Sequence, residues 1–382
     1  MSTIVFVGHE ASLTGAPFTQ LYLIQWLRAH TEHKVELILL RGGPLLEEFK
    51  KVANVHIVNN FIQSPTIGQR IVRKLLFILN QHTKNILNSV ARTKPCLIFA
   101  NTALTLDFAV NLKDFLKVPL IINVHELETI FFGRSSIAFA EKTKKLDFLI
   151  PGSEAVKSFY QSFCPISECQ IQVVYDFTNS QPVGNSTGAE IRTRFGIPQS
   201  AKIVGSIGSM GWRKGPDLFL QIAQQFRKQG EEDVYFIWVG GDPEASAYKE
   251  ILYDIRQMGL ADRVLFVGSQ TDLRGFYESF DVFLLTARED PFPLVCLEAG
   301  IMNCPTICFA GAGGIPEYVQ QDAGFVVPYA DIQVMTEKTL YLLKNEDVRE
   351  KMGLIAHQRV DNHHTIRTIG PEMHEIIQKF IK

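Results

Sequence analysis

Short apolar runs rich in β-branched residues alternate along the chain with longer segments whose apolar residues recur at helical spacing. The first such series is TIVFVG at residues 3–8, an amphipathic stretch at 16–30, and KVELILL at 34–40. Continuous apolar strands separated by helices are typical of parallel sheets that are covered on both faces. The pattern therefore predicts an α/β fold with doubly wound sheets.

The same alternation continues almost to the end of the chain. In the first half, further strands are expected at residues 96–100, 119–124, 148–152 and 171–175. In the second half they are expected at residues 202–208, 234–240, 263–268, 281–287, 305–309 and 324–327. No sequence repeat is evident, so the likeness of the halves is one of architecture.

A polar, irregular stretch at residues 176–190, DFTNSQPVGNSTGAE, interrupts this alternation near the middle. Its composition is typical of a linker between domains. We expect a Rossmann-like N-terminal domain at 1–180 and a second one at 195–365. The remaining residues, 366–382, are expected to form a helix that packs back on the N-terminal domain.

Length and composition agree with two soluble globular domains. The chain has 382 residues, 46% hydrophobic and 20% charged, and a formal net charge of −2. This apolar content excludes a disordered chain, and the charge gives no general attraction to nucleic acid. The start, MSTIVFVGHE, lacks the basic and apolar regions of a secretion signal, so a cytoplasmic location is expected.

The charge pattern has one local anomaly, a segment without acidic residues from Phe49 to Leu106. Within it, residues 71–90 can be drawn as an amphipathic helix with a basic edge. A solvated helix face explains this pattern, because such helices are common. The alternative is a peripheral contact of the basic segment 70–94 with the anionic inner face of a membrane.

Candidate chemistry lies where strands end and helices begin, because ligands bind at those junctions in parallel α/β sheets. After the first strand, GHEASLTGAP offers Gly15 for close backbone approach and Pro17 for the first turn of a helix. In FAGAGGIPEYV, the pair Gly313 and Gly314 can form an anion-binding nest. An ordinary tight turn is the alternative at both junctions.

A third junction, GSIGSMGWRKGPDLF, carries two cations before a helix expected to start at Pro216. Arg213 and Lys214 would add charge to the N–H donors of the loop, an arrangement suited to a diphosphate. Two solvated cations on a surface turn are the alternative.

The fourth junction is TAREDPFPLVCLEAG, where a strand leads into a helix expected to start near Pro293. Asp290 lies after the strand, and Glu298 lies about a turn and a half into the helix. Leu294 and its helical repeats would face the core, so Glu298 flanks an apolar stripe. An acid in that position is costly unless it accepts hydrogen bonds, and ligand hydroxyls would supply them.

These four junctions, in this order, resemble the retaining GT-B glycosyltransferases, in particular glycosyltransferase family 4. The spacing of Asp290 and Glu298 is similar to the acid-x7-acid motif of that family, and TGAP, RKG and GGIPE fall at its other loops. The resemblance covers nearly the whole chain and is most specific from Gly205 to Pro328. It implies two Rossmann-like domains that face a central cleft, and sugar transfer from a nucleoside-diphosphate donor with retention of configuration.

The resemblance also implies roles for individual residues. Glu298 would hold the ribose hydroxyls and Asp290 the donor sugar, while Arg213 and Lys214 neutralise the diphosphate. Gly15 would approach the phosphates, and His125, in the sequence NVHE, would sit over the reacting sugar. The donor-binding set that the resemblance implies is Gly15, Gly208, Ser209, Glu289, Leu294, Val295, Glu298, Gly313 and Gly314.

Two positions depart from the family pattern. Ser209 stands where the family commonly has Arg, so one diphosphate contact is absent or comes from Arg213. Asp290 stands where the first acid is usually Glu, with Glu289 adjacent, so either acid could face the sugar. For His125, a core histidine at a strand end is the alternative.

We expect neither a metal nor a cofactor other than the donor substrate, because the chain contains no Asp-x-Asp and the cations could replace a metal. The six cysteines show no C-x-x-C spacing and are expected to be reduced. Two further functions stay open. One is a GT-B-like protein that binds a nucleotide sugar or glycan without turnover, and the other is a GT-B enzyme such as a nucleotide-sugar epimerase.

Overall fold

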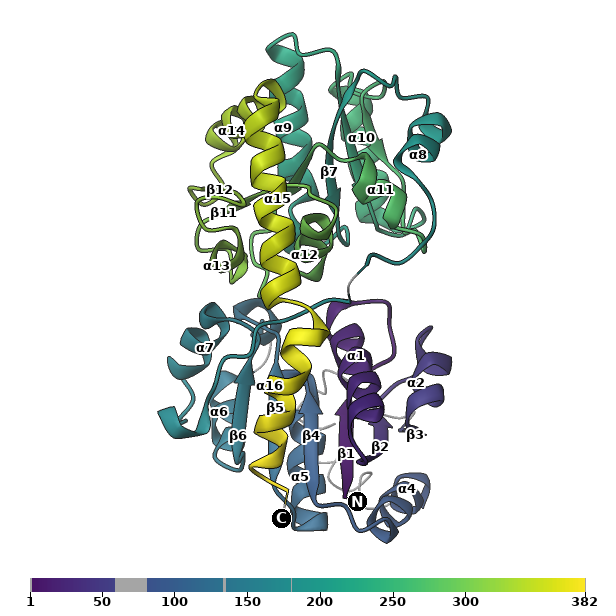
Figure 1. Cartoon of the computed structure of the whole chain (residues 1–382), viewed down its shortest axis with the longest axis vertical. Coiled ribbons are helices and arrows are strands. Elements are labelled where there is room, and N and C mark those ends of the chain that lie inside the picture. Colours follow the sequence, from purple (N-terminus) through teal and green to yellow (C-terminus); the bar gives the residue numbers. More distant parts are fainter. Residues whose placement is uncertain (1, 59–80, 133–134, 180, 382) are drawn as a thin grey trace. The chain divides into compact units, whose positions relative to one another are not determined.

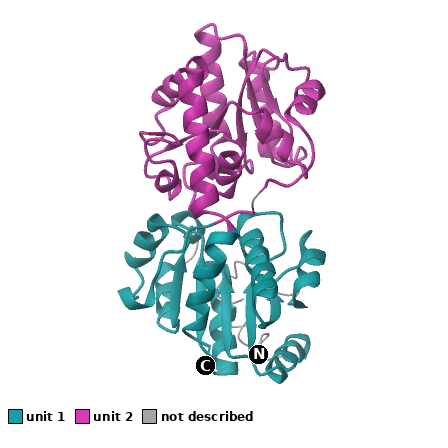
Figure 2. Ribbon diagram, viewed as in Figure 1, with its two compact units in different colours: residues 1–176, 366–382 teal, residues 177–365 magenta. Residues whose placement is uncertain are grey.

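The computed structural model describes residues 2–58, 81–132, 135–179 and 181–381, and the chain forms two compact units (Figure 1). Unit 1 comprises Met1–Asp176 and Ile366–Lys382, and unit 2 comprises Phe177–Thr365 (Figure 2). Each unit has its own sheet and its own hydrophobic core.

Unit 1 is built on a six-stranded parallel sheet in the order β3-β2-β1-β4-β5-β6. Its strands are β1 (Thr3–Gly8), β2 (Lys34–Leu39), β3 (Asn54–Ile57), β4 (Leu97–Asn101), β5 (Leu120–Val124) and β6 (Phe148–Pro151). Its α-helices are α1 (Gly15–His30), α2 (Leu46–Val52), α4 (Gln81–Arg92), α5 (Leu106–Leu116), α6 (Ser136–Thr143), α7 (Glu154–Gln161) and α16 (Ile366–Gln378).

Unit 2 repeats this topology with a sheet in the order β12-β11-β10-β7-β8-β9. Its strands are β7 (Lys202–Ile207), β8 (Val234–Val239), β9 (Val264–Phe266), β10 (Val282–Leu285), β11 (Thr306–Phe309) and β12 (Gly324–Val327). Its α-helices are α8 (Gly188–Phe195), α9 (Pro216–Lys228), α10 (Ser246–Gln257), α11 (Arg274–Ser279), α12 (Leu294–Ile301), α13 (Ile315–Val319), α14 (Ile332–Lys344) and α15 (Glu346–His363). The predicted α/β class with two doubly wound sheets is confirmed.

The central strands are apolar on both faces because helices cover both sides of each sheet. Ile4, Val5, Phe6 and Val7 are consecutive in β1, and none has any exposed surface. Full burial of one such side chain contributes roughly 1.5–3 kcal/mol. These central strands therefore hold the loops at their carboxyl ends on a rigid base.

The C-terminal helix belongs to unit 1, where α16 packs on α1. A Cβ atom at Gly370 would lie 2.6 Å from the indole of Trp26, so this contact needs a glycine. Unit 2 begins at Phe177, earlier than the predicted residue 195. The reason is that the expected linker is bound to unit 2: Leu273 N–H donates to Val183 O, and Asp272 accepts from the backbone of Ser186.

Two strand assignments differ from the sequence pattern. Residues 171–175 form only a single bridge, between Ile171 and Leu149. The N–H groups of Gln172 and Val174 donate to the carbonyls of Leu149 and Pro151, but Pro151 has no N–H to donate in return, so the segment is not a full strand. The edge strand β3 was not expected, because it is short and alternates polar residues with Val55 and Ile57 in place of a continuous apolar run. Of the basic segment 70–94, residues 70–80 lie outside the described residues, and α4 covers most of the rest. None of the described helices is long and apolar enough to cross a membrane.

Candidate active site

The loop between β7 and α9 brings both predicted cations of unit 2 to one carboxylate. Lys214 Nζ donates to Asp290 Oδ2, and Arg213 Nη1 lies 3.7 Å from the same oxygen. Arg213 also donates to the backbone oxygen of Glu289 at 2.7 Å. A turn of solvated cations would not make these contacts, so the loop is tied to the segment that carries the acids.

Asp290 is 5% exposed and lies between two loops. Its backbone N–H donates to Ala312 O, and it forms a bridge with Gly313. Gly313 has a φ of 137°, and a Cβ there would lie 1.8 Å from the oxygen of Asp290, so only glycine fits. The Gly314 N–H donates to Pro291 O, which means that this amide is not open to an anion in the structure.

Glu298 lies on α12, whose apolar stripe packs inward as predicted: Leu294, Leu297 and Ile301 are buried. One oxygen of Glu298 accepts a 2.6 Å hydrogen bond from the Tyr277 hydroxyl. Burial raises the pKa of Glu298 to about 7, although the Tyr277 hydrogen bond acts in the opposite direction. A protein hydroxyl thus meets part of the need that sequence analysis assigned to a ligand.

The other predicted donor-binding residues of unit 2 lie on the same loops and helix. Gly208 follows β7 and accepts a hydrogen bond from the indole N–H of Trp238 at 3.0 Å, while Ser209 beside it is exposed. Val295 and Glu289 are both partly exposed. Ser209 is therefore open to a ligand but offers only a hydroxyl, with no charge.

In unit 1, Gly15 begins α1 and is exposed, and Pro17 occupies the first turn as expected. His125 follows β5, and its side chain is 8% exposed. Its Nε2 lies 2.8 Å from Asn101 Oδ1, and its Nδ1 lies 2.7 Å from Asp176 Oδ1. These two partners were not identified from the sequence, because Asn101 and Asp176 are far from His125 in the chain and match no motif.

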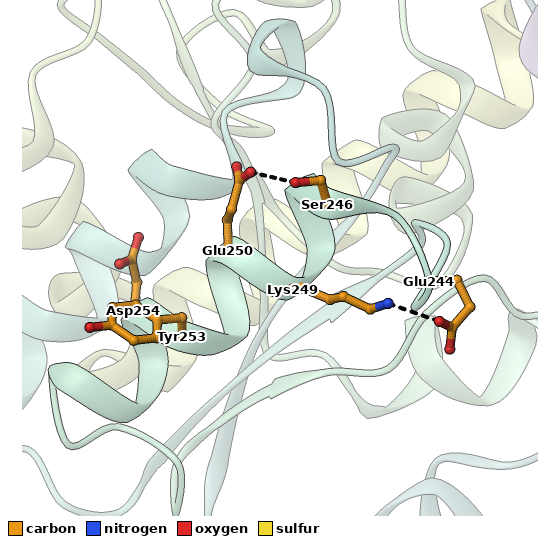
Figure 3. Close-up of a pocket in the computed structure, with 6 residues that line it drawn as sticks. All are labelled: Glu244, Ser246, Lys249, Glu250, Tyr253 and Asp254. Carbon is orange, nitrogen blue, oxygen red and sulfur yellow. Dashed lines mark hydrogen bonds and ion pairs between the residues drawn. The ribbon is translucent and has the colours of Figure 1, made fainter.

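The surface hollow on α10 contains none of these residues. It is lined by Glu244, Ser246, Lys249, Glu250, Tyr253 and Asp254, all from α10 and the turn before it (Figure 3). Glu250 accepts from Ser246, and Lys249 donates to Glu244, as the dashed lines show. This is a polar helix face with one ion pair, Lys249 with Glu244, and it contains none of the predicted site residues.

A protein-family model described as glycosyl transferases group 1 matches residues 188–359. The matched residues lie within unit 2 and make up less than half of the chain. The matched region holds both cations, the two acids and the Gly313-Gly314 loop. The resemblance inferred from the four junctions is therefore confirmed for the region where the motifs are most specific.

Relatives in other organisms have similar sequences over part of the chain. N-acetyl-alpha-D-glucosaminyl L-malate synthase of Bacillus anthracis is 31% identical over 193 residues, which cover 50% of this chain and 49% of that protein. D-inositol 3-phosphate glycosyltransferase of Corynebacterium diphtheriae is 23% identical over 270 residues, which cover 66% of this chain and 63% of that protein. The chain thus spans about half of the first relative and less than two thirds of the second.

Solved structures extend the likeness to the whole chain. Anabaena Alr3699/HepE in complex with UDP-glucose superposes with a TM-score of 0.83 at 18% identity, covering 99% of this chain and 100% of that one. Sucrose-phosphate synthase from Thermosynechococcus elongatus has a TM-score of 0.79 at 18% identity, covering 99% of both chains. The chain has the GT-B type of fold, with two Rossmann-like domains.

Proposed function

We propose that the chain is a retaining glycosyltransferase that moves a sugar from a nucleoside-diphosphate sugar to an acceptor. The observation that carries the proposal is the convergence of Lys214 and Arg213 on Asp290, inside the region that matches the group 1 family. Glu298 follows on the next helix with one oxygen already held by Tyr277. These are the cations and acids that sugar transfer from a diphosphate would use.

The difficult event in this reaction is departure of the diphosphate from a developing oxocarbenium ion. Preorganised cations aimed at the leaving oxygens stabilise such a transition state. Lys214 donates to Asp290, and Arg213 donates to the Glu289 carbonyl, so both cations are held in position by the protein. Because two cationic side chains could take the place of a metal at the diphosphate, we propose that transfer needs no divalent metal.

For the donor we propose that Glu298 binds the ribose and Asp290 binds the sugar. We propose uracil as the base, and a uridine diphosphate sugar is therefore the first donor to test. The support for uracil is that the HepE structures contain UDP or UDP-glucose. The acceptor is a glycan, a lipid or a small molecule. In unit 1, we propose that Gly15 and His125 act on the phosphates and on the sugar, as the resemblance implies.

The test is turnover of a panel of labelled nucleoside-diphosphate sugars, beginning with UDP-glucose, with and without a chelator. We expect release of the nucleoside diphosphate in both conditions, and a product whose anomeric proton coupling matches that of the donor. Loss of turnover in chelator, restored by Mg²⁺ or Mn²⁺, would contradict metal independence. A product of the opposite anomeric configuration would contradict retention.

The two alternatives, binding without turnover and epimerisation, give different outcomes in the same experiment. A protein that binds without turnover, as the Ser209 departure would allow, shows saturable binding and no free nucleoside diphosphate. An epimerase converts the sugar in the absence of any acceptor. The cytoplasmic location and a membrane contact through 70–94 stay predictions, and sedimentation with anionic vesicles tests the second.

A further inference from the structure

His125 lies in a closed polar group at the carboxyl ends of β4 and β5 in unit 1. Its ring is in contact with Asn101 from β4 and with Asp176, the last residue of the first segment of unit 1. All three side chains are nearly enclosed: Asn101 is 2% exposed, Asp176 is 5% exposed, and the His125 side chain is 8% exposed. The contacts among these side chains decide which ring nitrogens of His125 carry a proton.

The proton on Nε2 of His125 follows from a chain of donors and acceptors. The Ala16 carbonyl can only accept, and Asn101 Nδ2 lies 2.8 Å from it, so this nitrogen is the donor. The other atom of the same amide, Oδ1, therefore faces His125 Nε2 at 2.8 Å. Because Oδ1 can only accept, Nε2 carries a hydrogen.

Nδ1 of the same ring faces a carboxylate. If Nδ1 had no hydrogen, its lone pair would lie 2.7 Å from the Asp176 oxygen, which is repulsive. The carboxylate lies off the line of the ring N–H, so the contact is a charge pair more than a straight hydrogen bond. The attraction between an imidazolium and a carboxylate does not require a linear N–H···O angle. It favours the protonated ring, which carries a hydrogen on Nδ1.

Asp176 in turn needs a cation, because a buried carboxylate without one is costly. Among the described residues, His125 is the cation within ion-pair distance of Asp176. The carboxylate is held against Gly152, where a Cβ would lie 2.7 Å from Oδ2, and the Asp176 backbone N–H donates to Gly152 O. The acid is thus fixed from one side by backbone and from the other by the ring.

We infer that Asp176 is a positioning residue that holds His125 as an imidazolium with both N–H groups directed into the protein. His125 then places a fixed positive charge at this edge of the sheet. It has no ring nitrogen with which to give a proton to a substrate or take one from it. The protonation state of His125 does not depend on the proposed function. Only the further step, that this positive charge acts on the bound donor, rests on it.

Other charged groups around the ring are consistent with a single positive charge. Glu126 accepts at Oε2 from the backbone N–H groups of His125 and Ala103. Burial lowers the pKa of His9, a neighbouring ring that also interacts with Glu10 and Arg41, so His9 does not compete as a cation at neutral pH. Burial by itself would lower the pKa of His125, but the close carboxylate of Asp176, with the charge of Glu126, raises it above 6.5.

The test is a pH titration of the histidine ring nitrogens by NMR in the full chain labelled with ¹⁵N-histidine. The chain has ten histidines, and His125→Gln assigns the signals of His125. We expect two N–H resonances for His125 at pH 7, with a midpoint above pH 6.5. In Asp176→Asn only burial remains as the main influence, so the midpoint should fall below pH 6.5.

His56 provides a control in the same spectra. It forms a second histidine–carboxylate pair in unit 1, with Nε2 2.8 Å from Glu36, and it lies at β3, on the opposite edge of the sheet from β6. Asp176→Asn should leave the His56 signals unchanged. A neutral His125 at pH 7 in the natural protein overturns the inference, and so does an unchanged midpoint in Asp176→Asn. If Asp176→Asn does not fold, titration of the natural protein and of Asn101→Asp still tests the inference. Asn101→Asp adds a second carboxylate beside the ring and should raise the His125 midpoint.

Turnover separates this inference from the proposed function. With UDP-glucose as the probe, we expect turnover of the natural protein to fall as pH rises through the His125 midpoint. The fall should come at lower pH in Asp176→Asn. A protonated ring without turnover of any donor contradicts the proposed function and leaves the charge assignment standing. Turnover that is independent of the His125 charge contradicts its link to the donor.

Discussion

The two sheets have the same strand order, but the polar groups beside them are partnered differently. In unit 2, Lys214 pairs with Asp290, and Tyr277 donates to Glu298. In unit 1, the Gln20 amide and Thr102 Oγ1 are buried and have no hydrogen-bond partner among the described residues. At these places unit 2 thus carries charges that are paired with one another, whereas part of the hydrogen-bonding capacity in unit 1 is unused.

The comparison shows that the sheet topology sets where polar groups gather. The side chains at that position then determine the chemistry of the site. The positive charges at the candidate site of unit 2 are those of a lysine and an arginine. In unit 1 the corresponding charge is that of a histidine, whose state depends on its neighbours. Substitutions that remove one charge or one hydrogen bond test this contrast directly.

The largest effect is expected for Lys214→Ala in unit 2. The variant removes a cation from the diphosphate site, which should cost about 2–4 kcal/mol of transition-state stabilisation, or roughly 30- to 1000-fold in turnover. Steady-state turnover with a donor measures it. Near-normal turnover in a folded variant would remove Lys214 from the mechanism.

Lys214→Ala also leaves Asp290 buried, with Arg213 at 3.7 Å as the one remaining cation within ion-pair distance in the described part of the chain, so stability needs a control. The double variant Lys214→Ala with Asp290→Asn removes both charges. It should recover most of the free energy of unfolding that Lys214→Ala loses, without recovering turnover. Recovery of both would show that the loss of activity came from unfolding.

The next effect is on the pH dependence of stability in unit 2. The folded pKa of Glu298, about 7, is above its ordinary 4.5, so its protonated form is favoured by folding. That contribution is complete below pH 4.5 and is lost as pH rises to 7. Glu298→Gln keeps a neutral side chain, so above pH 7 it should be more stable than the natural protein by at most about 3 kcal/mol.

Urea unfolding at several pH values between 4 and 8 measures this difference. Glu250→Gln, on the polar face of α10, is the matched control and should show no such trend. Equal stability of Glu298→Gln and the natural protein at pH 8 would mean that Glu298 is hydrated in solution.

A comparable effect on turnover is expected for the acid that touches the sugar. Asp290→Asn should slow transfer by about 10- to 150-fold, because one charged hydrogen bond contributes roughly 1.5–3 kcal/mol. Affinity for the free nucleoside diphosphate should not weaken, since Lys214 loses its counter-charge. Calorimetry and turnover on the same samples test both. If Glu289→Gln slows transfer and Asp290→Asn does not, Glu289 is the sugar-facing acid.

The smallest effect is expected in unit 1, at Gln20. This side chain is 3% exposed, and both of its amide atoms lack a partner among the described residues. Gln20→Met keeps the length and removes the unpaired amide, so the free energy of unfolding should rise by about 1 kcal/mol. A loss of stability would instead show that a bound water or ligand completes the amide in solution.

Much of the fold could be predicted from the sequence because its signals are local. The continuous apolar strands, the start of α9 at Pro216 and the inward stripe on α12 all depend on neighbouring residues. The exceptions lie at sheet edges, at residues 171–175 and at β3. Pairing there depends on one neighbouring strand, which local composition does not report.

The candidate site was only partly predictable. The acid spacing and the two cations were visible as motifs, and the group 1 family model matches residues 188–359, which contain them. Tyr277, Asn101 and Asp176 were missed, because each meets its partner only after the chain has folded. Contacts between residues far apart in sequence leave no periodic signal.

The sequence by itself determined the class of fold, the junctions that carry chemistry, and the kinds of side chain found there. Only the tertiary structure decided how those side chains are paired. Lys214 donates to Asp290, Glu298 accepts from the Tyr277 hydroxyl, and His125 lies between an amide and a carboxylate. The physical reason is that burial and partner geometry set the charge of an ionisable group, and both arise when separate strands come together.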